Sequence, residues 1–102
     1  MSAEAVFCVV ERGKADRIVK KAVKAGARGA TIFYGRGAGA DTFSFFHNLN
    51  VESSKEIIVI IVTEKTREPI LSALLAESHV DEEGRGILFT IPITEVHGIN
   101  NL

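Results

Sequence analysis

A run of six aliphatic residues, Ile57 to Val62, constrains the fold of this chain more than any other segment. Successive side chains of a strand point to opposite faces of a sheet, so a strand that is apolar at every position is covered on both faces. The chain has 102 residues, the size of one domain, and its other patterns supply only two helices, enough for one face of a small sheet. We therefore expect a single domain over residues 1–102 whose second sheet face meets sister subunits.

Apolar periodicity along the chain predicts four strands and two helices. The strands are predicted over residues 5–10, 30–34, 56–63 and 87–94, and the helices over 14–25 and 67–77. The first helix repeats apolar residues at helical spacing from Ala15, and the second does so from Ile70, with Thr66 as its expected N-cap. Pro92 has no backbone N–H, which favours an edge position for the last strand. The order β-α-β-β-α-β is that of an α+β ferredoxin-like plait.

Charge, cysteine content and hydropathy exclude several classes of protein. Twelve basic and thirteen acidic residues leave no positive excess for neutralising phosphates, so we expect no nucleic-acid partner. The one cysteine, Cys8, lies in an apolar run and is expected to be a buried small side chain without a disulfide. No apolar run approaches the roughly 20 residues of a membrane span, and the N-terminus lacks a signal-peptide pattern. The expected location is the cytoplasm.

Two glycine-bearing segments are the candidate ligand sites. One follows the second predicted strand, which runs into alternating glycines without a subsequent helix pattern, and the other precedes the last strand. The candidate ligand-binding residues are Thr31, Gly35, Arg36, Gly37, Gly39, Gly84, Arg85 and Gly86. Backbone N–H groups beside an arginine can hold an anion such as a phosphate, and the two segments could converge on one ligand. The alternative is that the glycines only permit tight turns at the strand ends.

The segment from about residue 36 to 55 is long for a connection without regular structure in a domain of this size. Its apolar residues Phe43, Phe45, Phe46 and Leu49 are not typical of a flexible linker. They are expected either to pack into the core or a subunit interface, or to form a docking surface for a partner protein. Both interpretations stay open from the residues alone.

Catalytic and metal-binding patterns are absent from the sequence. The three histidines, His47, His79 and His97, are isolated from other ligands at metal-binding spacing. The serines lie in no nucleophile-elbow context, and no histidine and carboxylate can be grouped by spacing. We therefore expect no enzyme activity, no metal site and no tightly bound cofactor.

Three short motifs resemble the P-II signal-transduction proteins of nitrogen regulation, and more closely their divergent P-II-like relatives. The motifs are Gly26-Ala-Arg-Gly29-Ala-Thr31-Ile32, Gly37-Ala-Gly39 and Gly84-Arg-Gly86-Ile-Leu-Phe89, and the resemblance covers nearly the whole chain. Gly37 and Gly39 match the glycine-aromatic-glycine at the base of the family's T-loop, so residues 36–55 correspond to that loop. The third motif is similar to the B-loop signature, which places the B-loop at about residues 81–86.

The resemblance implies a compact homotrimer that binds an adenine nucleotide between subunits and docks its T-loop on a target, a transporter or metabolic enzyme. Thr31, Gly37 and Gly39 would line one side of the nucleotide cleft, and the B-loop residues 84–86 the other. Gly35 and Arg36 are neighbouring candidates from their own chemistry. The phenylalanines and Leu49 of the loop would contact the target.

Departures from the family pattern bear on the choice of ligand. Ile87 stands where the family has a phosphate-contacting lysine, Asp41 replaces a glutamine, and Gly98 and Asn100 replace two arginines. Each charged contact to a phosphate contributes about 1.5–3 kcal/mol, so the loss of three weakens triphosphate binding and makes ADP, AMP or cyclic AMP as well suited as ATP. An alternative function is a metal-tolerance or structural trimer of the divalent-ion type, with the same fold and no nucleotide.

Overall fold

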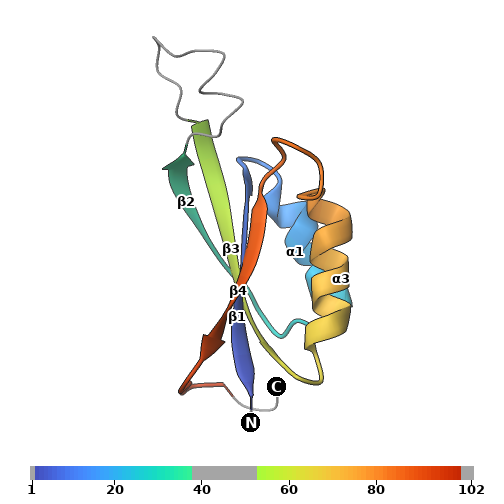
Figure 1. Cartoon of the computed structure of the whole chain (residues 1–102), viewed down its shortest axis with the longest axis vertical. Helices are drawn as coiled ribbons and strands as arrows, with labels where there is room; N and C mark the ends of the chain where they lie inside the picture. Colours follow the sequence, from blue (N-terminus) through green and yellow to red (C-terminus); the bar gives the residue numbers. More distant parts are fainter. Residues whose placement is uncertain (1, 38–52, 100–102) are drawn as a thin grey trace.

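The computed structural model of this chain describes residues 2–37 and 53–99. The elements follow one another as β1 (Ala3–Glu11), α1 (Ala15–Lys24), β2 (Thr31–Gly37), β3 (Ser53–Thr63), α3 (Arg67–Ser78) and β4 (Ile87–Ile93). The strands form one antiparallel sheet in the order β2-β3-β1-β4, and both helices lie on the same face of it (Figure 1). The predicted β-α-β-β-α-β ferredoxin-like arrangement is confirmed. Pro92 lies in β4, an edge strand as predicted.

The hydrophobic core lies between the sheet and the two helices. Val23 and Leu75, expected in the apolar stripes of the helices, are 49% and 38% exposed. Alternate residues of β1 and β3 face the core layer, and they are fully buried together with the inner residues of the helices. The largest of these side chains are Val6, Val10, Ile18, Ile58, Ile60, Val62, Ile70 and Leu74. Cys8 is among the buried residues, as its apolar surroundings predicted.

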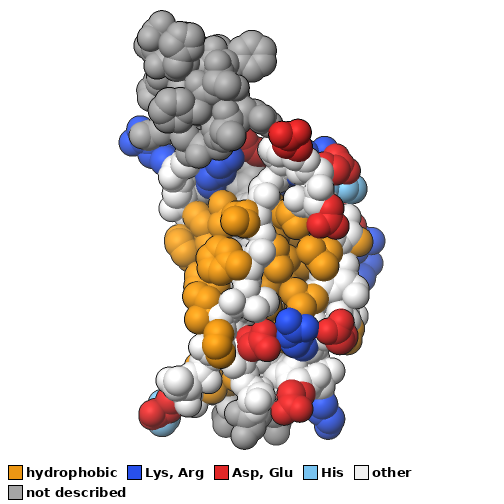
Figure 2. Space-filling view, viewed as in Figure 1, with side chains coloured by type: hydrophobic (Ala, Val, Ile, Leu, Met, Phe, Trp, Pro, Cys, Tyr) orange, Lys and Arg blue, Asp and Glu red, His pale blue; other side chains and the backbone are white. Residues whose placement is uncertain are grey.

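The other face of the sheet carries apolar side chains that neither of the described helices covers (Figure 1). Phe33, Ile87, Phe89 and Ile91 remain 46%, 56%, 41% and 45% exposed. Phe89 stacks on Phe7 of the neighbouring strand, with 5.0 Å between ring centroids. Figure 2 shows the apolar side chains gathered over the strands on the side away from the helices. The two-sided apolar pattern of Ile57 to Val62 therefore has a core on one side and an open apolar surface on the other.

The start of α1 depends on a residue distant in sequence. Glu56 on β3 is buried, and its Oε1 accepts hydrogen bonds from the backbone N–H groups of Gly13 at 3.0 Å and Ala15 at 2.8 Å. The first N–H groups of a helix have no partner within the helix, and Lys14 at the N-cap supplies no side-chain bond. A carboxylate from the sheet thus caps the helix and fixes it to β3.

The structure differs from the sequence-based expectation at two boundaries. Thr66 is at the N-cap of α3, but its side chain makes no capping bond; its Oγ1 accepts a hydrogen bond from the N–H of Thr63 at 2.9 Å. The hydroxyl closes the turn before the helix. The second strand does not end at residue 34 but continues to Gly37, because Ser53 to Lys55 extend the partner strand opposite it. Residues 36, 37 and 53–55, expected in the long loop, are therefore part of the sheet.

Among the described residues, no helix is long and apolar enough to span a membrane.

Candidate functional site

The first glycine segment lies in the β2–β3 ladder. Gly35 pairs with Lys55 and Gly37 pairs with Ser53. The N–H of Arg12 donates to the carbonyl oxygen of Ser54 at 3.2 Å, so the backbone groups of Ser54 face β1. In an antiparallel ladder the direction alternates, which turns the backbone groups of the residues on either side of Ser54 toward β2. The backbone N–H groups of Gly35 and Gly37 consequently point toward β3. The sequence had suggested that these N–H groups are free to bind a ligand.

Gly35 also has a packing reason to be glycine. A Cβ atom at this position would lie 3.0 Å from Cδ1 of Ile57, which is tighter than ordinary side-chain contacts. At Gly37 the nearest atom to such a Cβ is Cγ of Lys55, at an ordinary 3.7 Å. Packing therefore constrains the first glycine of the segment and leaves the second with room for a side chain.

Two side-chain contacts connect the end of β1 and the turn that follows it to the β2–β3 hairpin. The guanidinium carbon of Arg12 lies 5.0 Å from the ring centroid of Tyr34, a cation–π contact. On the neighbouring strands, Nζ of Lys55 lies 3.2 Å from Oε2 of Glu11. No local sequence pattern links the first turn to the hairpin, so these four residues were not predicted. Together these contacts join the first turn and β1 to β2 and β3.

The second glycine segment passes very close to the backbone of β1. Gly84 has a φ of +78° and Gly86 a φ of +141°, both in regions that favour glycine. A Cβ atom on Gly86 would lie 2.3 Å from the carbonyl oxygen of Val9. The chain can enter β4 along this path only if residue 86 has no side chain. The glycine that matches the B-loop motif is thus explained by packing.

Arg85, the cation of this segment, is already paired. Its Nη1 lies 3.1 Å from Oε1 of Glu82, while Nδ1 of His79 lies 3.3 Å from the other oxygen of the same carboxylate. His79 ends α3 in the left-handed conformation, with a φ of 59°. All three side chains are partly exposed, so the pairs are weak individually and can be exchanged for an anionic ligand.

The two glycine segments lie at the same end of the sheet but on opposite edges (Figure 1). The register places Phe33, Ile57, Val9 and Ile87 in one row across the four strands. Three strand spacings separate β2 from β4, a distance of about 14 Å. Thr31 lies further from this end, opposite Val59. Within one chain the two segments therefore do not meet at one small ligand.

Several predicted residues lie outside the described part of the chain. These are Gly39 of the first glycine segment and the candidate docking residues Phe43, Phe45, Phe46 and Leu49.

The described residues contain no group of three or more His, Cys, Asp and Glu side chains that could hold a metal ion. Burial raises the pKa of the Cys8 thiol. This thiol remains protonated and belongs to the core.

Comparisons with known proteins agree with the motifs. The sequence model of the nitrogen regulatory protein P-II family matches residues 3–101. Among solved structures, Arabidopsis thaliana PII bound to citrate is similar to this chain, with a TM-score of 0.70 and 21% identity over 90% of this chain and 78% of that one. A comparison with curated proteins found no match. At this identity the structural likeness concerns the fold, whereas the family model covers almost every residue. This chain belongs to the nitrogen regulatory protein P-II family.

Proposed function

We propose that this protein is a homotrimeric P-II-like signal-transduction regulator that binds an adenine nucleotide or another small anion between subunits. The observation that carries the proposal is the position of the two glycine segments, at one end of the sheet but on opposite edges. A neighbouring copy that brings its β4 edge near the β2 edge of the first would form a cleft from both segments. The ligand would then select the arrangement of the T-loop that docks on a target, a transporter or metabolic enzyme.

The open face of the sheet supports assembly. Its exposed apolar side chains come from the edge strands β2 and β4 and continue through Phe7 and the alternate residues of β3. Contiguous apolar surface of this kind is typical of protein interfaces and unfavourable in water. A domain of this size also buries a modest share of its own surface, so subunit contacts add to its stability.

A pair of matched variants tests the assembly. Phe89 on the open sheet face is 41% exposed, and Leu75 on the outer side of α3 is 38% exposed. Phe89→Ser should reduce the particle mass toward the 11.0 kDa of one chain, whereas Leu75→Ser should keep the trimer. The measurement is light scattering coupled to size-exclusion chromatography at several protein concentrations. A monomeric wild-type protein, or equal behaviour of the two variants, would contradict the proposal.

The ligand class follows from the cationic and glycine-bearing character of the cleft. Arg85 can leave Glu82 for an anion of higher charge density, and Gly84 keeps the backbone accessible beside it. The structurally similar Arabidopsis PII was solved with citrate, itself a small polyanion, which agrees with an anionic effector. At positions 87, 98 and 100 this chain lacks the basic residues that the family has there. Nucleotides with fewer phosphates should therefore be tested alongside ATP.

Isothermal titration calorimetry should be run against ATP, ADP, AMP and cyclic AMP, with and without Mg²⁺, bicarbonate and 2-oxoglutarate. We expect micromolar binding with about one site per subunit. Arg85→Ala should weaken it by roughly 10- to 100-fold, since a charged contact contributes about 1.5–3 kcal/mol. The control is Arg67→Ala, because this arginine pairs with Glu4 at the other end of the sheet. If an intact trimer binds none of these compounds, the proposal of a nucleotide effector is refuted. The alternative of a structural or divalent-ion trimer would then remain.

A further inference from the structure

Helix α1 and its flanks carry an unusual share of the positive charge. Six of the twelve basic residues, but only one of the thirteen acidic ones, lie between residues 14 and 28. Lys20, Lys21 and Lys24 are exposed and form no ion pair with any carboxylate in the described part of the chain, while Arg17 lies 3.2 Å from Oε1 of Glu77. Since the whole chain has a net charge of −1, this basic surface is local.

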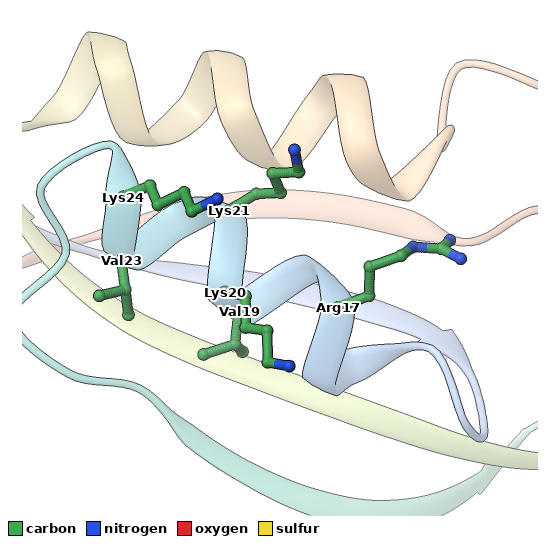
Figure 3. Close-up of a pocket in the computed structure, with 6 residues that line it drawn as sticks. All are labelled: Arg17, Val19, Lys20, Lys21, Val23 and Lys24. Carbon is green, nitrogen blue, oxygen red and sulfur yellow. The ribbon is translucent and has the colours of Figure 1, made fainter.

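A hollow of about 430 Å³ lies within this basic surface, lined by Arg17, Val19, Lys20, Lys21, Val23 and Lys24 (Figure 3). Val19 and Val23 are one helical turn apart and point in the same direction, toward the β3 side of α1, with Lys20 beside them. Val23 is 49% exposed although its side chain is apolar. The surface therefore has two valines with Lys20 beside them on the β3 side, whereas Lys21 and Arg17 extend away from the valines (Figure 3), and lysine stems add apolar surface.

We propose that this α1 surface is a docking site for an acidic segment of a partner protein, which inserts an apolar side chain between Val19 and Val23. The carboxylates of the segment would pair with Lys20 and Lys24, which lie one helical turn apart on α1. Apolar contacts flanked by polar groups that stay near water are usual at protein interfaces. Charge complementarity selects an acidic partner, and the concave shape favours a peptide side chain over a flat bilayer. Nucleic acid would satisfy the lysines, but beyond the thymine methyl group it offers little aliphatic surface for the valines.

The proposed site is separate from the open sheet face and from the glycine segments. The helices lie on the opposite face of the sheet, so covering the open face with other copies would leave α1 accessible. The proposal therefore holds whether or not the protein binds an effector. Failure of the calorimetric and mass experiments would leave the test of this site interpretable.

The test is a titration of the uniformly ¹⁵N-labelled full chain, followed by NMR, with a 12-residue peptide of glutamates and alanines that carries one central phenylalanine. We expect shifts concentrated at residues 17–24, and weaker binding as salt is raised. Combining Lys20→Glu with Lys24→Glu should lower the affinity about tenfold, from two lost charge pairs and their repulsion. The matched control is Lys65→Glu, which reverses the charge of an exposed residue on the turn after β3. This substitution should change the affinity for the peptide less than twofold.

Two further comparisons separate the apolar contribution from the charges. Val23→Ser keeps every charge and should weaken binding severalfold, as should replacing the phenylalanine of the peptide with serine. The proposal is overturned if the peptide shifts no α1 signals at millimolar concentration, or if Lys65→Glu has the same effect as the α1 reversals. It is also overturned if vesicles with one quarter phosphatidylglycerol, or a 20-base-pair DNA duplex, bind α1 more tightly than the peptide.

Discussion

Replacing Gly86 with alanine should destabilise the protein by about 2–6 kcal/mol. A φ of +141° belongs to a region that residues with a side chain occupy at a cost of about 1–3 kcal/mol. The new Cβ would also lie 2.3 Å from the carbonyl oxygen of Val9, so the start of β4 has to move away from β1. Forcing extra atoms into packed structure costs typically about 1–3 kcal/mol more. Since small domains have about 5–15 kcal/mol of stability, the variant should be conspicuously weakened.

Two other glycines separate the contributions to this loss. Gly26 has a φ of +122°, but a Cβ there would meet nothing within 4 Å, so Gly26→Ala should show the backbone cost alone. Gly29 has neither a positive φ nor a close neighbour, and Gly29→Ala should be neutral or slightly stabilising. The measurement is urea unfolding at one fixed protomer concentration, because assembly makes apparent stability depend on concentration. The argument fails if Gly86→Ala is no less stable than Gly26→Ala.

The remaining predictions concern Glu56, Cys8 and the contact between Arg12 and Tyr34. Glu56→Ala should cost about 1–3 kcal/mol by leaving the N–H groups of Gly13 and of Ala15, the first residue of α1, without an acceptor. Exposed Glu64→Ala should cost almost nothing in the same urea experiment. Cys8 should react with a thiol reagent only as fast as the protein unfolds. Because burial raises the pKa of this thiol in the folded state, the unfolded chain ionises first, and stability should fall as the pH rises past the ordinary thiol pKa. The contact between Arg12 and Tyr34 should contribute about 0.5–1 kcal/mol, measured as the coupling energy of a double-mutant cycle to alanine.

Local periodicity was sufficient to predict the elements of this fold. The alternation and the helical repeats depend on neighbouring residues alone, so all six elements were found, and the helix bounds agree within about one residue. Pro92 marked an edge strand because its missing N–H is a local property. The end of β2 was wrong, since Gly35 to Gly37 continue the strand only where Ser53 to Lys55 pair with them.

The candidate site was less predictable than the fold. The sequence identified Arg85 and Gly86 as candidate ligand residues from composition and motif, and their ligand role stays a prediction. The pairing of Arg85 with Glu82, and the closeness of Gly86 to Val9, could not be read from the motif. Both depend on how the last turn meets the sheet.

The sequence by itself determined the element order, the two-sided character of the third strand and the family. Only the tertiary structure decided that the two glycine segments lie on opposite edges of one sheet, and that a glutamate on β3 caps a helix 41 residues earlier. The physical reason is that periodicity and turn chemistry act over a few residues, whereas strand order and register bring together residues that no local pattern connects.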